Sequence, residues 1–390
     1  MDAALQQAIV FIDDAHTFGG TQIALAWTVY TVLNRTDIPV LCVCTARTRK
    51  AIEEVVGLHS RLFFVEAPRA LPLNILSFSL RLFAYFKLIG QIRRHSVRAW
   101  WLNLADIEFG LAPLVVLRTY GETTHSYLHG TARFSSFYRH ASIPRRVLSW
   151  LRDVLAESFA YRLHHLLVTP SMASQIEVRS RLGRDSNRPT GHLYYPPIGK
   201  QAELTQAPSV QPQTANMKTI HLWMIGGVVF GHKNNLAALD VLALLVKQGF
   251  EVTLTIAGTG PDLGRFQQAA EDGNLSSRIT YLGWVSDPCD IAPKDALIFI
   301  PSFHETMNIV AREAMRNGLR VVVSPIPVFL EWIPESLIAA DFSPEAFCEK
   351  LHEVRVMQAK EIAASYSVAL ARFSSDAFIE EFLRFTRIQP

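Results

Sequence analysis

The chain has 390 residues, of which 49% are hydrophobic and 19% are charged, and its formal net charge is +3. This composition excludes a disordered chain, and the length suits two domains of roughly 150 to 200 residues each. The chain has four cysteines, which show neither the density of a disulfide scaffold nor metal-ligand spacing. We therefore expect reduced, packed thiols at Cys42, Cys44, Cys289 and Cys348.

The first residues include Asp2, Asp13 and Asp14 and lack the basic start and apolar stretch of a secretory signal. No apolar run approaches the roughly 20 residues that are needed to span a bilayer. We therefore expect a cytoplasmic protein without a membrane-spanning segment.

The charge is divided unevenly along the chain. Residues 1–200 carry 23 Lys and Arg against 14 Asp and Glu, whereas residues 201–390 carry 15 against 21, which gives +9 and −6. The amino half should therefore attract an anionic surface and the carboxyl half should not.

Short apolar runs alternate with amphipathic stretches in the amino half, a pattern that predicts a parallel sheet flanked by helices. Polar loops follow two of these runs, with Gly19 and Gly20 in one loop and His129 in the other. Ligands bind beyond the carboxyl ends of such strands, so both loops are candidate sites, although a plain turn or a structural histidine would look the same. The runs span 8–12, 39–44, 62–65, 98–103, 124–128 and 166–169.

Two stretches, 80–98 and 144–165, interleave Arg and Lys with large apolar residues and are predicted to be basic amphipathic helices. Such helices either pack on a sheet with their basic faces in water or lie on an anionic membrane, where each basic residue contributes about 1 kcal/mol. The charge of the amino half leads us to the hypothesis of peripheral contact with the inner face of the cytoplasmic membrane.

Residues 201–218 are rich in Gln, Pro, Ala, Ser and Thr and read as a linker between domains. The alternating pattern then resumes, and a final amphipathic helix at 371–390 is expected to pack back on the first domain. The sequence thus predicts two Rossmann-like, doubly wound α/β domains at 1–200 and 219–370, with a cleft between them. The second set of strand candidates spans 219–225, 251–257, 278–283, 296–300 and 320–323.

The segment 299–324, FIPSFHETMNIVAREAMRNGLRVVVS, contains a strand, a polar turn, a helix and another strand. Glu305 falls in the turn and Glu313 inside the helix, so the two carboxylates can reach opposite ends of one bound molecule. Backbone N–H groups of Met307, Asn308 and Ile309 lie where the helix starts and suit a diphosphate. By itself, an isolated Glu here would indicate only a capped helix with solvated carboxylates.

Three further loops follow strand candidates of the carboxyl half. Residues 225–234, IGGVVFGHKN, place Gly227 and Lys233 before a helix, although a loop lysine is usually only solvated. Residues 257–261, AGTGP, place Gly258 in a weak dinucleotide-like fingerprint whose next glycine, Gly264, is misplaced. In the loop 281–287, Trp284 is equally compatible with contact to a nucleobase and with core packing.

Segment 299–324 resembles the signature of glycosyltransferase family 4, in which a PS turn and a Glu are followed eight residues later by a second Glu within Glu-Ala-Met. The resemblance implies the GT-B architecture, a sugar contact for Glu305 and a ribose contact for Glu313. It extends to Lys233 as the diphosphate-binding lysine and to His129 beside the reacting sugar. Residues 257–261 and 281–287 match two loops of the family that lie at the nucleotide end of the donor pocket.

Two positions depart from the family pattern: Val228 stands in place of an arginine, and Asn308 stands in place of a glycine. Another cation could take the place of the missing arginine, or phosphate binding could rest on Lys233 and the helix start, or turnover could be slow. The fit around the sugar could differ because of the second departure.

The resemblance implies a retaining, metal-independent hexosyltransferase that uses a UDP- or GDP-sugar and a glycan or lipid-linked acceptor in polysaccharide or lipopolysaccharide synthesis. No cofactor and no nucleic acid are expected. The alternatives are a catalytically weak regulatory subunit that binds a nucleotide sugar, or a sugar-nucleotide epimerase. The expected catalytic residues are Glu305, His129 and Lys233, and the expected donor contacts are Gly19, Gly20, Gly227, Lys233, Gly258, Trp284, Glu305, Thr306, Met307, Asn308, Ile309 and Glu313.

Overall fold

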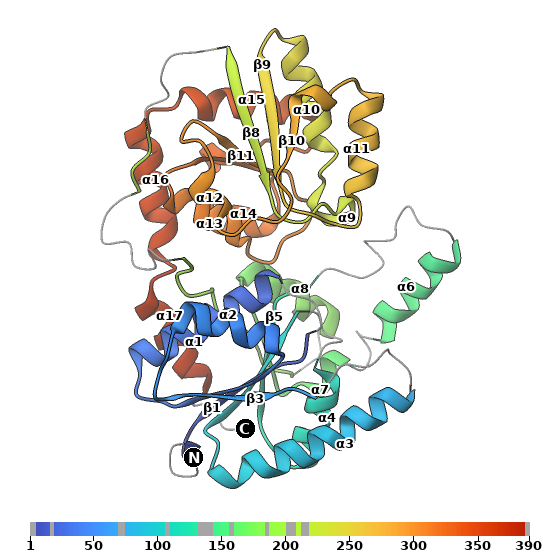
Figure 1. The fold of residues 1–390 in the computed structure, drawn as a ribbon, viewed down its shortest axis with the longest axis vertical. Helices are drawn as coiled ribbons and strands as arrows, with labels where there is room; N and C mark the ends of the chain where they lie inside the picture. Colours follow the sequence, from blue (N-terminus) through green and yellow to red (C-terminus); the bar gives the residue numbers. More distant parts are fainter. Residues whose placement is uncertain are drawn as a thin grey trace. The chain divides into compact units, whose positions relative to one another are not determined.

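The computed structural model describes residues 5–15, 19–68, 75–105, 110–131, 143–155, 160–183, 187–199, 208–211 and 218–386 (Figure 1). Its contacts divide the chain into two compact units. The first comprises Met1–Thr131, Val147–Ile198 and Phe373–Pro390, and the second comprises Ala132–Arg146 and Gly199–Arg372. Most of the predicted linker, residues 200–207 and 212–217, lies outside the described residues.

The first unit is built on a parallel sheet with the strand order β3-β2-β1-β4-β5-β6-β7. Most of its strands are buried along their whole length, which is why they read as continuous apolar runs in the sequence. The short edge strand β7 was not predicted, because its three residues include a glycine and no apolar run. The strands are β1 (Ile9–Asp13), β2 (Val40–Cys44), β3 (Leu62–Glu66), β4 (Ala99–Leu104), β5 (Thr124–Leu128), β6 (Leu166–Thr169) and β7 (Thr190–His192).

Helices follow most of these strands. Both basic stretches are shorter as helices than predicted: α3 ends at Ile92 and a 3-10 turn follows at Arg93–His95, because the chain must then enter β4. The stretch 144–165 contains α6 and the short α7, with residues 156–159 outside the described part of the chain. The helices are α1 (Gly20–Arg35), α2 (Ala46–Val56), α3 (Ile75–Ile92), α4 (Leu111–Thr119), α6 (Ile143–Leu155), α7 (Tyr161–Leu163) and α8 (Met172–Leu182).

The last helix, α17 (Ser375–Thr386), packs on the sheet of the first unit. The ring of Phe382 is fully buried and stacks on Trp101 of β4, with 4.8 Å between ring centroids. His125 Nε2 lies 3.0 Å from the carbonyl oxygen of Phe385, and a Cβ on Gly191 would meet the Phe385 ring at 2.4 Å. The carboxyl end of the chain therefore completes the core of the amino-terminal sheet.

The second unit has a five-stranded parallel sheet with the order β10-β9-β8-β11-β12. The strand order reverses at β8, which has β9 on one side and β11 on the other. Loops after β8 and β11 therefore meet at a topological switch point, where ligands bind in open α/β sheets. The strands are β8 (Thr219–Ile225), β9 (Glu251–Ala257), β10 (Ile279–Tyr281), β11 (Leu297–Ile300) and β12 (Arg320–Val323).

Helices of the second unit connect these strands, and further helices follow its last strand (Figure 1). They are α9 (Phe230–Lys233), α10 (Ala237–Lys247), α11 (Leu263–Asp272), α12 (Pro288–Ile291), α13 (Ile309–Arg316), α14 (Pro327–Trp332), α15 (Pro344–Val356) and α16 (Ala359–Ala371). The α/β prediction with two doubly wound parallel sheets is thus confirmed, whereas the cleft between the domains stays a prediction.

The four cysteines are free and buried, as expected. Within the described ranges, the structure contains no helix with the length and apolar character needed to cross a bilayer.

Candidate functional site

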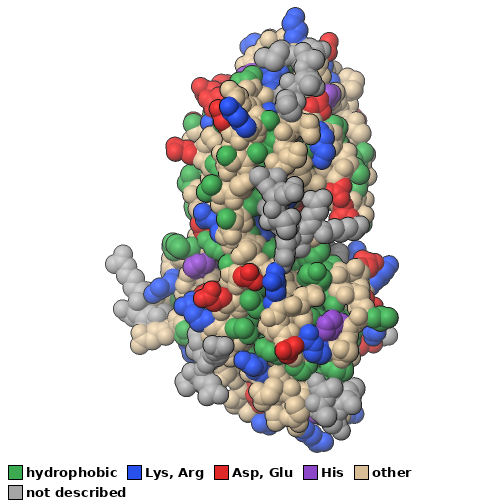
Figure 2. All heavy atoms as spheres, turned by 90° about the vertical axis from the view of Figure 1, so that its left-hand side faces the viewer, with side chains coloured by type: hydrophobic (Ala, Val, Ile, Leu, Met, Phe, Trp, Pro, Cys, Tyr) green, Lys and Arg blue, Asp and Glu red, His purple; other side chains and the backbone are tan. Residues whose placement is uncertain are grey.

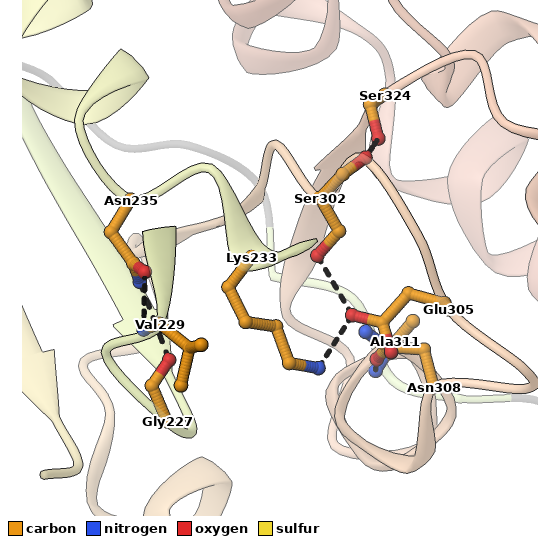
Figure 3. A network of polar contacts seen from close by, with 9 residues as sticks. All are labelled: Gly227, Val229, Lys233, Asn235, Ser302, Glu305, Asn308, Ala311 and Ser324. Carbon is orange, nitrogen blue, oxygen red and sulfur yellow. Dashed lines mark hydrogen bonds and ion pairs between the residues drawn. The ribbon is translucent and has the colours of Figure 1, made fainter. Parts of the chain in front are cut away.

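The loops that leave β8 and β11 line a pocket at the switch point of the second unit. The pocket brings together the predicted residues Gly227, Lys233, Glu305 and Asn308 (Figure 3). Gly258, Trp284 and Glu313 are not among its lining residues. The full lining comprises Met224, Ile225, Gly226, Gly227, Lys233, Asn235, Ile256, Phe299, Ile300, Pro301, Ser302, Glu305 and Asn308.

The loop after β8 is held in place by Asn235, whose importance the sequence did not indicate. Asn235 is 4% exposed, and its Oδ1 accepts from the backbone N–H of Val229 at 2.8 Å. Its Nδ2 lies 3.4 Å from the carbonyl oxygen of Gly227, which it contacts as a donor (Figure 3). A buried asparagine that satisfies backbone groups on both sides of a glycine loop gives that loop one conformation.

Val228, which stands in place of the family arginine, points away from solvent and is fully buried. Its backbone N–H donates to the carbonyl oxygen of Thr259 at 3.0 Å, so the loop continues the pairing of β8 with β9 beyond the strand ends. No side-chain cation can therefore come from this position.

Gly258 and Gly260 are required by this loop pairing, and the donor contact expected for Gly258 stays a prediction. A Cβ on Gly258 would lie 1.8 Å from the carbonyl oxygen of Gly226, and one on Gly260 would lie 2.2 Å from that of Val228. The glycines of the AGTGP segment therefore let the loop after β9 pack closely against the loop after β8, which lines the pocket.

Lys233 and Glu305 form the polar centre of the pocket. Lys233 Nζ lies 2.6 Å from Glu305 Oε1, and the hydroxyl of Ser302 donates to the same oxygen at 2.7 Å (Figure 3). The Glu305 side chain is 9% exposed and that of Lys233 is 29% exposed. The pair joins the end of α9 to the turn after β11, which are 72 residues apart in the chain.

Charge and burial act in opposite directions on Glu305. Burial alone would raise the pKa of its carboxyl, but Lys233 and Ser302 more than offset this and hold the pKa below its ordinary value. Burial beside Lys233 lowers the pKa of the neighbouring His232 to about 4. At neutral pH the site thus contains one carboxylate, one ammonium and a neutral imidazole.

Asn308 lies immediately before α13 with φ of 64°, a conformation that favours Gly or Asn. Its Oδ1 accepts from the N–H of Ala311 at 2.8 Å. The departure from the family glycine therefore preserves the left-handed backbone and adds a helix cap. Within the described residues, no protein acceptor is recorded for the N–H groups of Asn308 and Ile309, while the side chain of the preceding Met307 is buried.

Glu313 lies inside α13. It is close to Asp287, in the loop 281–287, and to Asp290, in the short helix α12. Burial and these two carboxylates raise its pKa to about 7, although Arg312 and Arg316 act in the opposite direction. Trp284, on the same loop as Asp287, is 69% exposed, so the core-packing interpretation of this residue is wrong.

The predicted residues Gly19, Gly20 and His129 belong to the first unit. Gly19 precedes α1, and its N–H donates to Gln22 Oε1 at 3.0 Å. His129 is 5% exposed, with Nδ1 at 2.6 Å from the Tyr195 hydroxyl and Nε2 at 2.7 Å from Asn103 Oδ1. Burial lowers its pKa to about 3, so the ring is neutral and both its nitrogens have protein partners.

Ser302 and Asn235 are the polar side chains of the pocket that the sequence prediction omitted. Ser302 belongs to the PS turn of segment 299–324, and Asn235 comes directly after the segment 225–234, so both lay in or beside segments from which other residues were selected. In the part of the chain that is described, no cluster of three or more His, Cys, Asp or Glu side chains is suited to hold a metal ion. Metal independence stays a prediction.

Gly258→Ala should lower the free energy of unfolding of the second unit by about 1–3 kcal/mol, because the new methyl group overlaps the backbone at Gly226. Gly264→Ala is the matched control, since nothing lies within 4 Å of its Cβ position and alanine favours helix α11. Urea unfolding measures both variants. Equal stability of the two would contradict the proposed backbone packing.

Glu313 should contribute stability that is lost as the pH rises. Its folded pKa of about 7 exceeds its ordinary value of 4.5, so between these two pH values the folded state binds the extra proton. The stability that this group loses across the window is up to about 3 kcal/mol. The buried His129 and His232 act in the opposite direction, so the quantity to measure is the difference between variant and wild type. In urea unfolding at stepped pH, the unfolding free energy of Glu313→Gln relative to wild type should rise by this amount across the window, whereas that of Glu349→Gln, at an exposed position of α15, should stay constant.

Comparison with known proteins finds a family match for the segment that contains this pocket. Residues 219–355 match the model of the family described as glycosyl transferases group 1. The putative glycosyltransferase EpsF of Bacillus subtilis is 30% identical over 103 residues, which cover 26% of this chain and 27% of EpsF. A GDP-mannose-dependent alpha-(1-6)-phosphatidylinositol dimannoside mannosyltransferase of Mycobacterium tuberculosis is 32% identical over 124 residues, or 31% of each chain. The matches thus span less than a third of these relatives.

Solved structures resemble the chain over nearly its full length. The lipopolysaccharide outer core galactosyltransferase WaaB has a TM-score of 0.65 at 16% identity, with 98% of this chain and 100% of WaaB covered. Anabaena HepE, in complex with UDP and glucose, has a TM-score of 0.69 at 14% identity with the same coverage. These identities support the fold alone. The chain therefore has the GT-B fold, and its residues 219–355 match the glycosyl transferases group 1 family.

Proposed function

We propose that the chain transfers a hexose from a nucleoside-diphosphate sugar to a glycan or lipid-linked acceptor, with retention of configuration. The observation that carries this proposal is the Lys233–Glu305 pair, which lies at the switch point of a group 1 glycosyltransferase domain. The start of α13 and the ammonium of Lys233 together offer a diphosphate two sources of positive potential.

In the proposed reaction, the bond between the anomeric carbon and the diphosphate oxygen breaks, and the acceptor oxygen forms its bond on the same face. Negative charge develops on the departing diphosphate, and Lys233 stabilises it. Because Val228 is buried, this task rests on Lys233 and the start of α13. The departing phosphate takes the proton from the acceptor hydroxyl, so no protein base is needed.

Glu305 is proposed to accept hydrogen bonds from the sugar. Its low pKa keeps it ionised, and its second oxygen remains for a ligand because Lys233 and Ser302 both contact Oε1. Glu313 is proposed to hold the ribose hydroxyls, and the exposed Trp284 to contact the base. His129 is proposed to line the acceptor side as a neutral ring, since a pKa of about 3 does not allow it to carry a proton at neutral pH.

The donor is proposed to be one of two nucleotide sugars, a UDP-linked glucose or a GDP-linked mannose. HepE was solved with UDP and glucose, and the mycobacterial relative is described as GDP-mannose-dependent. The proposed setting is the synthesis of a cell-surface polysaccharide or lipopolysaccharide, which is supported by the structural likeness to WaaB.

UDP or GDP should raise the melting temperature of the protein, and Lys233→Ala should weaken the affinity for that nucleotide roughly 10- to 100-fold by removing a charge-assisted contact. Lys247→Ala, at the exposed end of α10, is the matched control. Thermal-shift titration gives the affinities. Transfer is then assayed with and without acceptor glycans. Nucleotide binding without transfer would favour a regulatory subunit, and an isomerised donor without acceptor would identify an epimerase.

Peripheral contact with an anionic membrane is a second part of the proposal, and α6 supports it. Ser149 and Asp153 on this helix are buried, whereas Leu148 and Trp150 are 68% and 57% exposed. The helix thus directs its apolar face outward, and it also carries the exposed Arg146. On the face drawn in Figure 2, basic and acidic side chains are interspersed, so no single basic patch there accounts for binding.

The stretch 80–98 is less suited to this contact. Tyr85 and Ile89 of α3 are buried in the core, and Arg81 is paired with Asp14. On α3, Phe83 is 73% exposed and Lys87 is also exposed, so this helix offers less apolar surface beside its basic residues than α6 does.

The protein should sediment with anionic phospholipid vesicles at low salt, and the double substitution Leu148→Ser and Trp150→Ser should reduce the bound fraction, because it removes apolar area from α6. Leu330→Ser is the control, since Leu330 is 60% exposed in the second unit. The membrane proposal fails if the wild type does not sediment with these vesicles.

A further inference from the structure

A buried carboxylate at the carboxyl end of β1 is not used by the proposed reaction. Asp13 is fully buried in the first unit and is aligned with Asn103 in the register of β1 and β4. Among the described residues, no Lys or Arg lies within salt-bridge distance of it, and the nearby Arg81 pairs with Asp14 instead. Hydrogen bonds alone must therefore stabilise this group.

Three side chains from different elements supply these hydrogen bonds. Gln22 Nε2 of α1 and Asn103 Nδ2 of β4 both donate to Asp13 Oδ1 at 3.2 Å, and the Thr48 hydroxyl of α2 donates to Oδ2 at 2.8 Å. Because two amide nitrogens meet the same oxygen, the orientation of both amides follows from the carboxylate. A proton on Oδ2 would leave this orientation unchanged.

Each oriented amide then presents its oxygen to a loop. Gln22 Oε1 accepts from the N–H of Gly19, which fixes the turn before α1. Asn103 Oδ1 lies 2.7 Å from His129 Nε2, so this ring nitrogen must carry the hydrogen. Nδ1 of the same ring then accepts from the Tyr195 hydroxyl at 2.6 Å. One carboxylate thus controls hydrogen bonding at both loops that the sequence selected in the first unit.

We propose that Asp13 is a positioning residue: through Gln22 it holds the Gly19 turn, and through Asn103 it holds His129 as the neutral Nε2–H tautomer. The meaning of this arrangement for sugar transfer rests on the proposed function, in which both loops face substrate. The arrangement itself is a property of the first unit and can be measured without any substrate.

The test is nitrogen NMR of histidine side chains in the full chain labelled with ¹⁵N-histidine. The chain has 13 histidines, and His129→Asn identifies the signal by its loss. In the wild type, Nε2 of His129 should have the shift of a protonated ring nitrogen and Nδ1 that of an unprotonated one. Asp13→Ala should invert this pattern, because without an acceptor at position 13 the Asn103 amide can turn and donate to His129 Nε2.

The double substitution Asp13→Ala with Asn103→Asp should restore the Nε2–H tautomer, since a carboxylate at position 103 can only accept from the ring. Thr48→Val is the matched control, because it removes a hydrogen bond to Asp13 Oδ2 without touching either amide. The tautomer should also persist in Tyr195→Phe, which keeps Asp13 intact and serves if Asp13→Ala does not fold.

An Nδ1–H or cationic His129 in the wild type, an unchanged tautomer in folded Asp13→Ala, or its loss in Tyr195→Phe would each overturn the proposal. Once a donor and an acceptor are identified, Asp13→Ala should also lower kcat on the order of 100-fold through misplaced loops, with recovery in the double variant. If the wild type binds no nucleotide, the proposed function fails while the tautomer result still decides this inference.

Discussion

The ion pair between Lys233 and Glu305 joins the two loops of the switch point, and the candidate site depends on it. A carboxylate that is 9% exposed costs several kcal/mol to desolvate unless a partner compensates. Here the ammonium and the Ser302 hydroxyl provide this compensation at a single oxygen. The pair therefore holds both charges in the pocket, and both contacts to the carboxylate are made at the same oxygen.

Backbone packing behind the pocket is the second constraint. The loops after β8 and β9 continue the pairing of their strands, and only glycine at positions 258 and 260 permits that approach. This packing buries Val228, which explains why the position cannot present a cation from the same backbone. The positive potential of the site is consequently concentrated on Lys233 and the start of α13.

Both units place a buried carboxylate near the carboxyl end of a central strand, but they stabilise it differently. Glu305 has an ammonium partner, and its pKa is lowered despite burial. Asp13 has only neutral donors, and burial raises its pKa. The first arrangement suits binding of a charged ligand, whereas the second orients neighbouring amides and a neutral imidazole. Glu313 differs from both, because nearby carboxylates add to the effect of burial.

The sequence by itself determined the strands of both sheets except β7, and the loops that form the site, because buried parallel strands are continuous apolar runs and the loops carry local motifs. Only the tertiary structure decided that Gly258 serves backbone packing, that Asn308 reproduces a glycine conformation, that Trp284 is exposed and that β7 forms. It also decided the partners of Asp13 and Glu305, which come from residues 90 and 72 positions away. Such contacts and the resulting pKa shifts depend on burial and distance in space, which spacing along a chain does not encode.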